Sequence, residues 1–245
     1  MNAATYTRYE IVRAFRNRRF FIFSIGFPLV LYFVIAAPNR DAHDFGGSGI
    51  DAPLYLMVGL TAFGTMNAVL GVGARIAAER STGWNRQLRL TPLTSRAYFR
   101  TKVLTAYLTA SVTIMLLYAS GALLGVRIPA GRWIEMTLLM FIGLVPFAAL
   151  GILIGHLIGL DSIGPAMGGT TALLGLLGGV WFPIDSSGFM HDVAVLLPSY
   201  WLVQASHVAI GGGAWRSTGW LVVAAWSGLV ALAAAWAYRR DTSRY

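Results

Sequence analysis

The sequence predicts an all-α integral membrane protein with six transmembrane helices, an N-terminal interfacial helix and a re-entrant helical hairpin between helices five and six. Of the 245 residues, 56% are hydrophobic and only 12% are charged, about half the roughly 25% charged residues of soluble domains. The mean hydropathy is +0.63. Six apolar stretches approach the roughly 20 residues that a helix needs to cross the hydrocarbon core of a bilayer. Lipid is therefore the expected main solvent.

The N-terminal segment predicts an amphipathic helix followed by the first span. Residues 6–19 place apolar side chains on one broad arc of a helical wheel, namely Tyr9, Ile11, Val12 and Phe15. Arg8 and Arg16 interrupt this arc, but long arginine stems can lie on an apolar surface while the head reaches water or phosphate. An interfacial helix is therefore favoured over a disordered tail. Residues 20–37 form the first span, which is too long for a signal peptide and has no small-residue cleavage site after it.

Five further spans follow a polar loop at residues 38–53. They are expected at residues 54–77, 103–124, 133–158, 166–181 and 218–238. A strongly basic segment at residues 79–102 separates the second span from the third, and turns are expected at 125–132 and 161–165. Residues 182–213 are neither a clean span nor a clean loop, because prolines and acids interrupt apolar residues, and short re-entrant or interfacial helices fit them best. With no soluble domain boundary in the sequence, residues 1–245 are expected to form one membrane domain.

The distribution of basic residues predicts the topology. Six spans place both termini on one side, together with residues 75–102 and the 161–165 turn. That side carries 15 of the 19 Lys and Arg residues, whereas the other side carries Arg40, Arg127, Arg132 and Arg216. Short loops rich in Lys and Arg stay cytoplasmic. We therefore expect a multi-pass cell-membrane protein with both termini in the cytoplasm. In a soluble protein the net charge of +9 would suggest nucleic acid, but here the placement of the arginines matters more than their sum, and no nucleic-acid partner is expected.

The polar residues do not predict an enzyme. Cysteine is absent, and the four histidines, at positions 43, 156, 191 and 207, lack metal-ligand spacing, so no metal site and no catalytic residue are expected. For His156, a bond across to a neighbouring helix is favoured over a proton relay. No Gly-x-x-x-x-Gly-Lys phosphate loop is present, and Lys102 is the only lysine. The chain itself is expected to hold no cofactor, so if ATP drives it, a partner binds the ATP.

Two further patterns each allow two interpretations. Glycines recur at fourfold spacing at Gly151, Gly155 and Gly159 and again at Gly164/Gly168 and Gly175/Gly179. This spacing permits close helix contacts, either within the chain or between subunits. Residues 78–93 form a cytoplasmic segment in which Gly83 can turn and Thr91-Pro92 can close a short helix and cap the next. That segment is either a solvated loop that only sets topology or a docking helix for a cytoplasmic partner.

At this segment the sequence resembles the type-2 export permeases of the ABC transporter superfamily. Their loop after the second span reads Glu-Arg, then Gly-Thr and Leu, then Thr-Pro-Leu, and later a Lys. The matching residues, in order, are Glu79, Arg80, Gly83, Leu88, Thr91, Pro92, Leu93 and Lys102, whereas Trp84 stands where a threonine is usual. A second match is the Gly-x-x-Phe-Pro turn at residues 179–183, followed by Leu-Pro-x-x-Trp at 197–201. The resemblance covers nearly the whole chain.

The resemblance implies a membrane subunit that pairs with a second permease copy or a paralogue and with two ATPase subunits that bind ATP and Mg. It implies export of a hydrophobic or amphipathic substrate, such as a drug, antibiotic or lipid, by alternating access. The residues implied in ATPase coupling are Glu79, Arg80, Gly83, Arg86, Leu88, Thr91 and Pro92. The residues implied in the substrate pathway, for each of which packing is the alternative, are Tyr32, Phe33, Phe63, Met66, Met167 and Leu174. Phe182 and Tyr200 are candidates for an outer gate.

Three rival functions compete with this one. A secondary transporter needs ionisable groups or broken helices near the midplane, and the first, second, third and sixth predicted spans carry no buried acid. A membrane-embedded enzyme needs a catalytic pair, which the spans lack. A non-transporting scaffold or sensor is compatible with the sequence and stays open.

Overall fold

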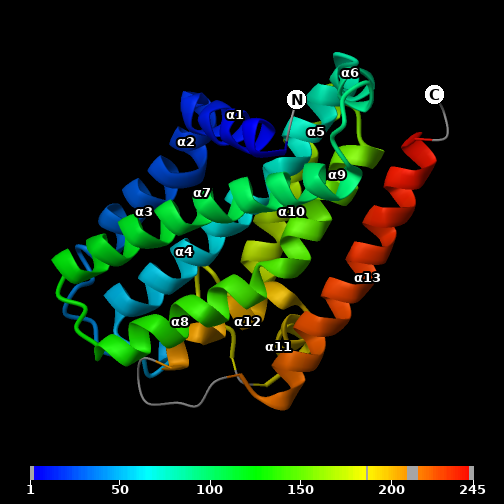
Figure 1. Cartoon of the computed structure of the whole chain (residues 1–245). Helices are drawn as coiled ribbons and strands as arrows, with labels where there is room; N and C mark the ends of the chain where they lie inside the picture. Colours follow the sequence, from blue (N-terminus) through cyan, green and yellow to red (C-terminus); the bar gives the residue numbers. More distant parts are fainter. Residues whose placement is uncertain (1–2, 186, 209–214, 243–245) are drawn as a thin grey trace.

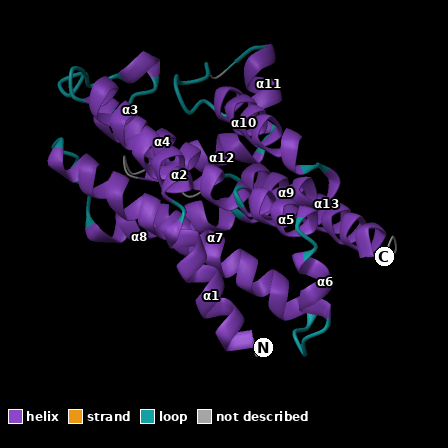
Figure 2. Ribbon diagram, turned by 90° about the horizontal axis from the view of Figure 1, so that it is seen from above, coloured by secondary structure: helices purple, strands orange, loops and turns teal. Residues whose placement is uncertain are grey.

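The computed structural model of the chain describes residues 3–185, 187–208 and 215–242, and these residues contain helices and loops but no strand (Figures 1 and 2). The first half of the chain forms α1 (Ala3–Arg16), α2 (Arg18–Phe21), the π-helical η1 (Ile22–Gly26), α3 (Phe27–Ala36), the 3-10 turn η2 (Phe45–Gly47), α4 (Ala52–Leu70), α5 (Val72–Ser81), α6 (Trp84–Arg89) and α7 (Ser95–Leu123). The second half forms α8 (Ala130–Gly143), α9 (Val145–Leu157), α10 (Leu160–Leu177), α11 (Phe189–Val195), α12 (Pro198–Gln204), η3 (Ala205–Val208) and α13 (Ser217–Thr242).

Four helical segments among the described residues are long and apolar enough to cross a membrane. They are Ala52–Ser81, Ser95–Leu123, Ala130–Leu157 and Ser217–Asp241. This confirms an all-helical protein with membrane-spanning helices. The count of six remains a prediction, because it also requires the shorter apolar helix Ser24–Ala36 and α10, whose first turns carry Asp161 and an internal Pro165. The re-entrant placement of α11 and α12 also remains a prediction.

Two of the long segments consist of paired helices. The α4 helix continues into α5 through Gly71, and α8 continues into α9 through Leu144, with Pro146 at the start of α9. Proline is tolerated in the first turn of a helix because its missing N–H would have no intrahelical partner there. At the α8–α9 joint, Pro146 therefore leaves no backbone N–H unpaired.

The core of the molecule is centred on α4. Nearly all side chains from Ala52 to Leu70 are buried, and α3, α7, α9, α10 and α12 pack around this helix. By contrast, α13 exposes much of its apolar surface, including Leu221, Leu229, Leu232 and Trp236. An apolar helix surface that faces away from the protein suits contact with lipid tails.

The glycines of α9 serve packing within the chain. A Cβ atom on Gly73 of α5 would collide with the carbonyl of Gly151, and a Cβ on Gly155 would lie 2.7 Å from the Gly73 carbonyl oxygen. The small-residue spacing thus brings α5 and α9 into close backbone contact. At Gly159, Gly164 and Gly168, an added Cβ would meet no neighbouring group of the described chain within 4 Å, so the alternative of a subunit contact stays open for them.

The structure corrects several predicted boundaries. The 161–165 turn is wrong, because the chain turns at Ile158 and Gly159, and α10 already begins at Leu160. The basic 79–102 segment is not one loop: α5 continues to Ser81 and α7 begins at Ser95. The helices extend into this segment because its charged residues find partners inside the protein, as described below. The second long helix, Ala52–Ser81, therefore carries a buried acid, Glu79, just beyond the predicted span 54–77, which itself contains no acid.

The interfacial helix also faces a different way from that expected of a soluble amphipathic helix. In α1, Tyr6, Glu10 and Ala14 are buried against the rest of the protein, whereas the apolar residues Tyr9, Val12 and Phe15 are exposed. Figure 2 shows α1 alongside α7, at the same end of the molecule as α6. An exposed apolar arc beside exposed Arg8 and Arg16 fits a helix that lies in the membrane interface.

Candidate functional site

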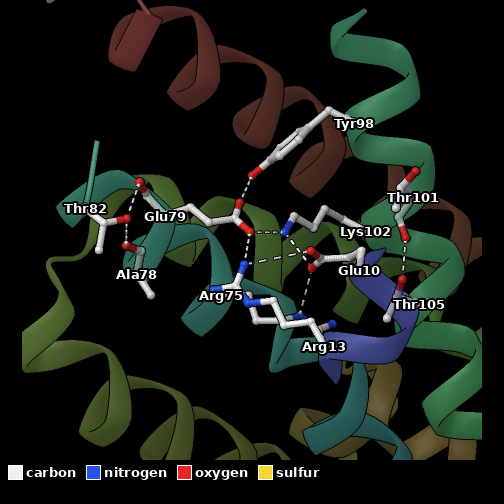
Figure 3. Close-up of polar contacts among 10 residues, drawn as sticks. All are labelled: Glu10, Arg13, Arg75, Ala78, Glu79, Thr82, Tyr98, Thr101, Lys102 and Thr105. Atoms are coloured by element: carbon white, nitrogen blue, oxygen red, sulfur yellow. Dashed lines mark hydrogen bonds and ion pairs between the residues drawn. The ribbon is translucent and has the colours of Figure 1, made fainter. Parts of the chain in front are cut away.

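A buried cluster of charges joins α1, α5 and α7 at the end of the molecule that carries α6 (Figure 3). Lys102 of α7 is fully buried, and its Nζ donates hydrogen bonds to Glu10 Oε1 at 2.7 Å and to Glu79 Oε1 at 2.5 Å. Both carboxylates are also buried. Burial of a charge is costly unless it is paired and hydrogen-bonded. The single lysine of the chain therefore neutralises two acids from two different helices.

Three more side chains complete what we call the charge network, defined as Glu10, Arg13, Arg75, Glu79, Tyr98 and Lys102. Arg13 Nη1 donates to Glu79 Oε1 at 3.0 Å, and Arg75 Nε lies 3.7 Å from Glu10 Oε1. The Tyr98 hydroxyl donates to Glu79 Oε2 at 2.7 Å. The network holds three cations and two carboxylates, so each of its carboxylates has a counter-charge.

Tyr6 lies beside the network and is fully buried. Burial, with the nearby Glu79 and Glu10 carboxylates adding to it, raises the pKa of the Tyr6 phenol well above its ordinary value. The hydroxyl is therefore neutral, and it has no hydrogen-bond partner among the described residues. Its ring stacks on Tyr98 with centroids 6.0 Å apart, so Tyr6 contributes packing rather than charge.

The connection between α5 and α7 is a short structured loop. Gly83 has φ 70°, ψ 9°, the left-handed conformation that glycine adopts most readily, and it ends α5 and starts α6. The Thr91 hydroxyl donates to the Leu88 carbonyl at 2.7 Å and so closes α6. Thr94, rather than Thr91, caps the next helix, by accepting a hydrogen bond from the Ala97 amide at 3.2 Å. The predicted turn and closure are thus present, but the predicted capping residue is wrong.

One face of α6 is anchored and the other is open. Leu88 is 6% exposed and packs with Tyr6 and Tyr98, whereas Leu90 is 89% exposed. Gln87 and Pro92 are both exposed, and the Arg86 side chain lies outside the described part of the chain. The loop therefore presents an apolar tip, centred on Leu90, on a base fixed to α1 and α7.

A second charged cluster fixes α13 to the base of this loop. Arg80 Nε pairs with Asp241 at 2.9 Å, and Arg80 Nη1 donates to the Gly155 carbonyl at 3.0 Å. His156 Nδ1 lies 3.1 Å from the same Asp241 carboxylate. The predicted cross-helix bond of His156 is confirmed. Arg80, one of the predicted coupling residues, holds α5, α9 and α13 together, and its coupling role remains a prediction.

Comparison with known proteins identifies the family. Residues 2–210 match the family described as "ABC-2 type transporter". The chain belongs to the ABC-2 type transporter family. It is also 26% identical over 216 residues to "Putative transport permease YvfS" of Bacillus subtilis (strain 168), an alignment that covers 84% of this chain and 81% of that protein. The resemblance seen in the sequence motifs is therefore confirmed at the level of the family.

The pathway residues predicted for this ABC-2 family member fall into two groups. Tyr32 and Met66 are fully buried and Met167 nearly so, and the Tyr32 hydroxyl donates to the Pro53 carbonyl at 3.1 Å. These three side chains pack inside the protomer in this conformation. Phe33 is exposed and Leu174 half-buried, so these two remain available to a cargo. Phe63 is half-buried between Phe27 and Trp181, with ring centroids 6.1 Å and 5.2 Å away.

The two outer-gate candidates of this ABC-2 family member line different hollows. Phe182 is exposed and lines a depression of about 360 Å³ with Phe189 and Met190. Tyr200 lines a larger cavity of about 950 Å³ and packs edge-on against His191. The structure does not bring Phe182 and Tyr200 together, and their role as a gate remains a prediction.

The sequence patterns do not identify the partners of Lys102 and Glu79. Glu10, Arg75 and Tyr98 are absent from the predicted sites, although each carries a signal. Glu10 is the only acid in the first 40 residues and Arg75 lies within an apolar stretch. Tyr98 and Lys102 are four residues apart, so they share one face of a helix. A single charged residue beside an apolar segment thus indicates that the residue is paired in the fold, but it does not indicate which residue is its partner.

Proposed function

We propose that the chain is the membrane-spanning permease subunit of an ATP-driven exporter, which moves a hydrophobic or amphipathic substrate such as a drug, an antibiotic or a lipid. Separate ATPase subunits would bind ATP and Mg, since this chain has no phosphate-binding loop. A second copy or a paralogue would complete the membrane unit, with the pathway between the two. The family match and the name of the Bacillus relative support this proposal.

The single observation that supports a coupling role is that one face of α6 is exposed while the other is packed against α1 and α7. Its exposed tip at Leu90 can contact a cytoplasmic partner, and its other face is held by Leu88 against Tyr6 and Tyr98. Behind these two rings lies the charge network that joins α1, α5 and α7. A displacement of α6 by an ATPase would therefore be passed to three helices at once instead of being absorbed by a flexible loop.

Substrate class and direction are inferred from the chemistry of the candidate pathway. The residues still available to a cargo, such as Phe33 and Leu174, are apolar, and apolar pathways suit hydrophobic or amphipathic molecules. ATP binding would shift the population between inward-open and outward-open states through its different affinity for the two. We accordingly propose export, with both termini cytoplasmic.

Copurification with candidate ATPase subunits tests the proposal. Tagged wild-type chain should retain an ATPase from detergent, and Leu90→Asp should lower the recovered ATPase roughly tenfold, because burial of a leucine at an interface contributes about 1.5–3 kcal/mol. Leu123→Asp is the matched control, because Leu123 is also highly exposed but lies at the far end of α7. Retention of the ATPase by Leu90→Asp would refute docking through α6.

The rival functions make different predictions in the same assay. A scaffold or sensor recovers no ATPase with any variant. A secondary transporter would use Glu79 as a proton or ion site, and substrate uptake would then follow an ion gradient without ATP. The hydrogen bonds of Glu79 to Lys102, Arg13 and Tyr98 favour a structural carboxylate instead.

A further inference from the structure

A cavity of about 950 Å³ lies within the protomer, at the end opposite the charge network. It is bounded by the loop before α4, the end of α10, the helices α11 and α12, and the start of α13; Figure 1 shows these elements at the end away from α1 and α6. Drug-sized ligands occupy cavities of about 300–1,000 Å³. The cavity is thus large enough for a whole small molecule.

Its lining side chains Trp215 and His191 each have a buried ring nitrogen without a hydrogen-bond partner among the described residues. Trp215 is 6% exposed, and its Nε1, which can only donate, has no hydrogen-bond partner among the described residues. Nδ1 of His191 is likewise buried and unpartnered within the described part of the chain. A buried donor left unsatisfied is costly. An acceptor inside the cavity would remove that cost.

The cavity also has a cationic side chain and an apolar wall. Arg216 lines it beside Tyr200; burial raises the pKa of the Tyr200 phenol and the Arg216 guanidinium opposes that rise, so the phenol is a neutral donor near a fixed positive charge. The apolar wall is formed by Ile184, Val195, Trp201 and Val203. Asp185 is a lining carboxylate as well, and it opposes the charge of Arg216.

We propose that this cavity binds an amphipathic anion, whose phosphate or carboxylate accepts hydrogen bonds from Arg216 and from Trp215 Nε1, and whose apolar part lies against Ile184, Val195 and Val203. A guanidinium and an indole N–H are both donors suited to such an oxyanion. The proposal does not depend on the proposed ATPase coupling, because this chain contains all the residues named.

Isothermal titration calorimetry on the purified chain in dodecyl maltoside tests this site with three probes. Hexyl phosphate should bind saturably, at one molecule per protomer. Inorganic phosphate should bind at least tenfold more weakly because it lacks the apolar part, and hexyltrimethylammonium should not bind because it carries the opposite charge. Equal affinity for inorganic phosphate would refute an amphipathic site, and equal affinity for the ammonium would refute an anion site.

Substitutions then assign the residues. Arg216→Gln should weaken hexyl phosphate binding roughly tenfold, as expected for a charge-assisted hydrogen bond, and Trp215→Phe about fivefold, because it removes only the N–H. Asp185→Asn should strengthen binding. The controls are Arg127→Gln and Trp220→Phe, since neither residue lines the cavity and the Trp220 ring packs on that of Trp215 at 5.2 Å. Because Arg216 is exposed, its variant should fold even where Trp215→Phe does not. Absence of saturable binding, or equal weakening in the controls, would overturn the proposal.

Discussion

Replacement of Lys102 by methionine tests whether the charge network holds the helices together. Methionine keeps the length of the side chain as far as Cε but removes the ammonium that bonds to Glu10 at 2.7 Å and to Glu79 at 2.5 Å. Removal of one partner from a buried ion pair typically destabilises a protein by about 3–5 kcal/mol, because the other charge stays buried and uncompensated.

The structure narrows this range. Two buried carboxylates remain in Lys102→Met, but Arg13 still lies 3.0 Å from Glu79 and Arg75 still lies 3.7 Å from Glu10. Two cations then face two anions, so neither carboxylate is without a counter-charge. We therefore expect a loss near the lower end, roughly 3 kcal/mol. If Glu79→Gln is added to Lys102→Met, part of this loss should be recovered, because the double variant removes both charges of the Lys102–Glu79 pair.

Unfolding in mixed dodecyl maltoside and SDS micelles, followed by tryptophan fluorescence, measures these free energies. Arg132→Met is the matched control, because Arg132 and Glu135 form an ion pair of 3.3 Å in which the two side chains are 35% and 39% exposed. Such exposed pairs contribute about 0–1 kcal/mol. If Lys102→Met were no more destabilising than Arg132→Met, the network would not be a determinant of stability and the reasoning would fail.

Further substitutions separate hydrogen bonding from packing. Tyr98→Phe should destabilise the protein by about 1.5–3 kcal/mol in the same assay, because the Tyr98 hydroxyl donates to the Glu79 carboxylate. Tyr6→Phe should be close to neutral, because the Tyr6 hydroxyl has no partner among the described residues. Equal effects of the two substitutions would contradict the hydrogen-bond assignment. Gly73→Ala should cost about 1–3 kcal/mol, since its Cβ would strike the backbone of α9. Gly168→Ala, whose Cβ would meet no neighbouring group of the described chain within 4 Å, is its control and should not destabilise, and a tolerant Gly73→Ala would argue against the close α5–α9 contact.

Much of the fold follows from local patterns in the sequence. The long apolar helices and the αL turn at Gly83 depend on hydropathy and on backbone preferences that neighbouring residues determine. The C-terminal end of α5 and the N-terminal end of α7 could not be predicted in this way, because they depend on partners that are distant in the sequence. Lys102 and Glu10 are 92 positions apart, so nothing near either residue indicates that its charge is neutralised. A charged residue whose partner is distant in sequence is therefore read as a loop residue, although it lies inside a helix.

The same distant pairing has a mechanical consequence for α1. This helix cannot leave α7 without separating Glu10 from Lys102, and it cannot leave α5 without separating Arg13 from Glu79. Each separation would leave a carboxylate buried or require water to enter. Because Lys102 also bonds Glu79 of α5, the three helices are coupled through one ammonium. The α6 loop is covalently joined to α5 and α7 and packs on Tyr6 of α1 through Leu88. We therefore expect α1, α6 and the adjoining ends of α5 and α7 to move as one body, so that a force on Leu90 would displace helices rather than bend a loop.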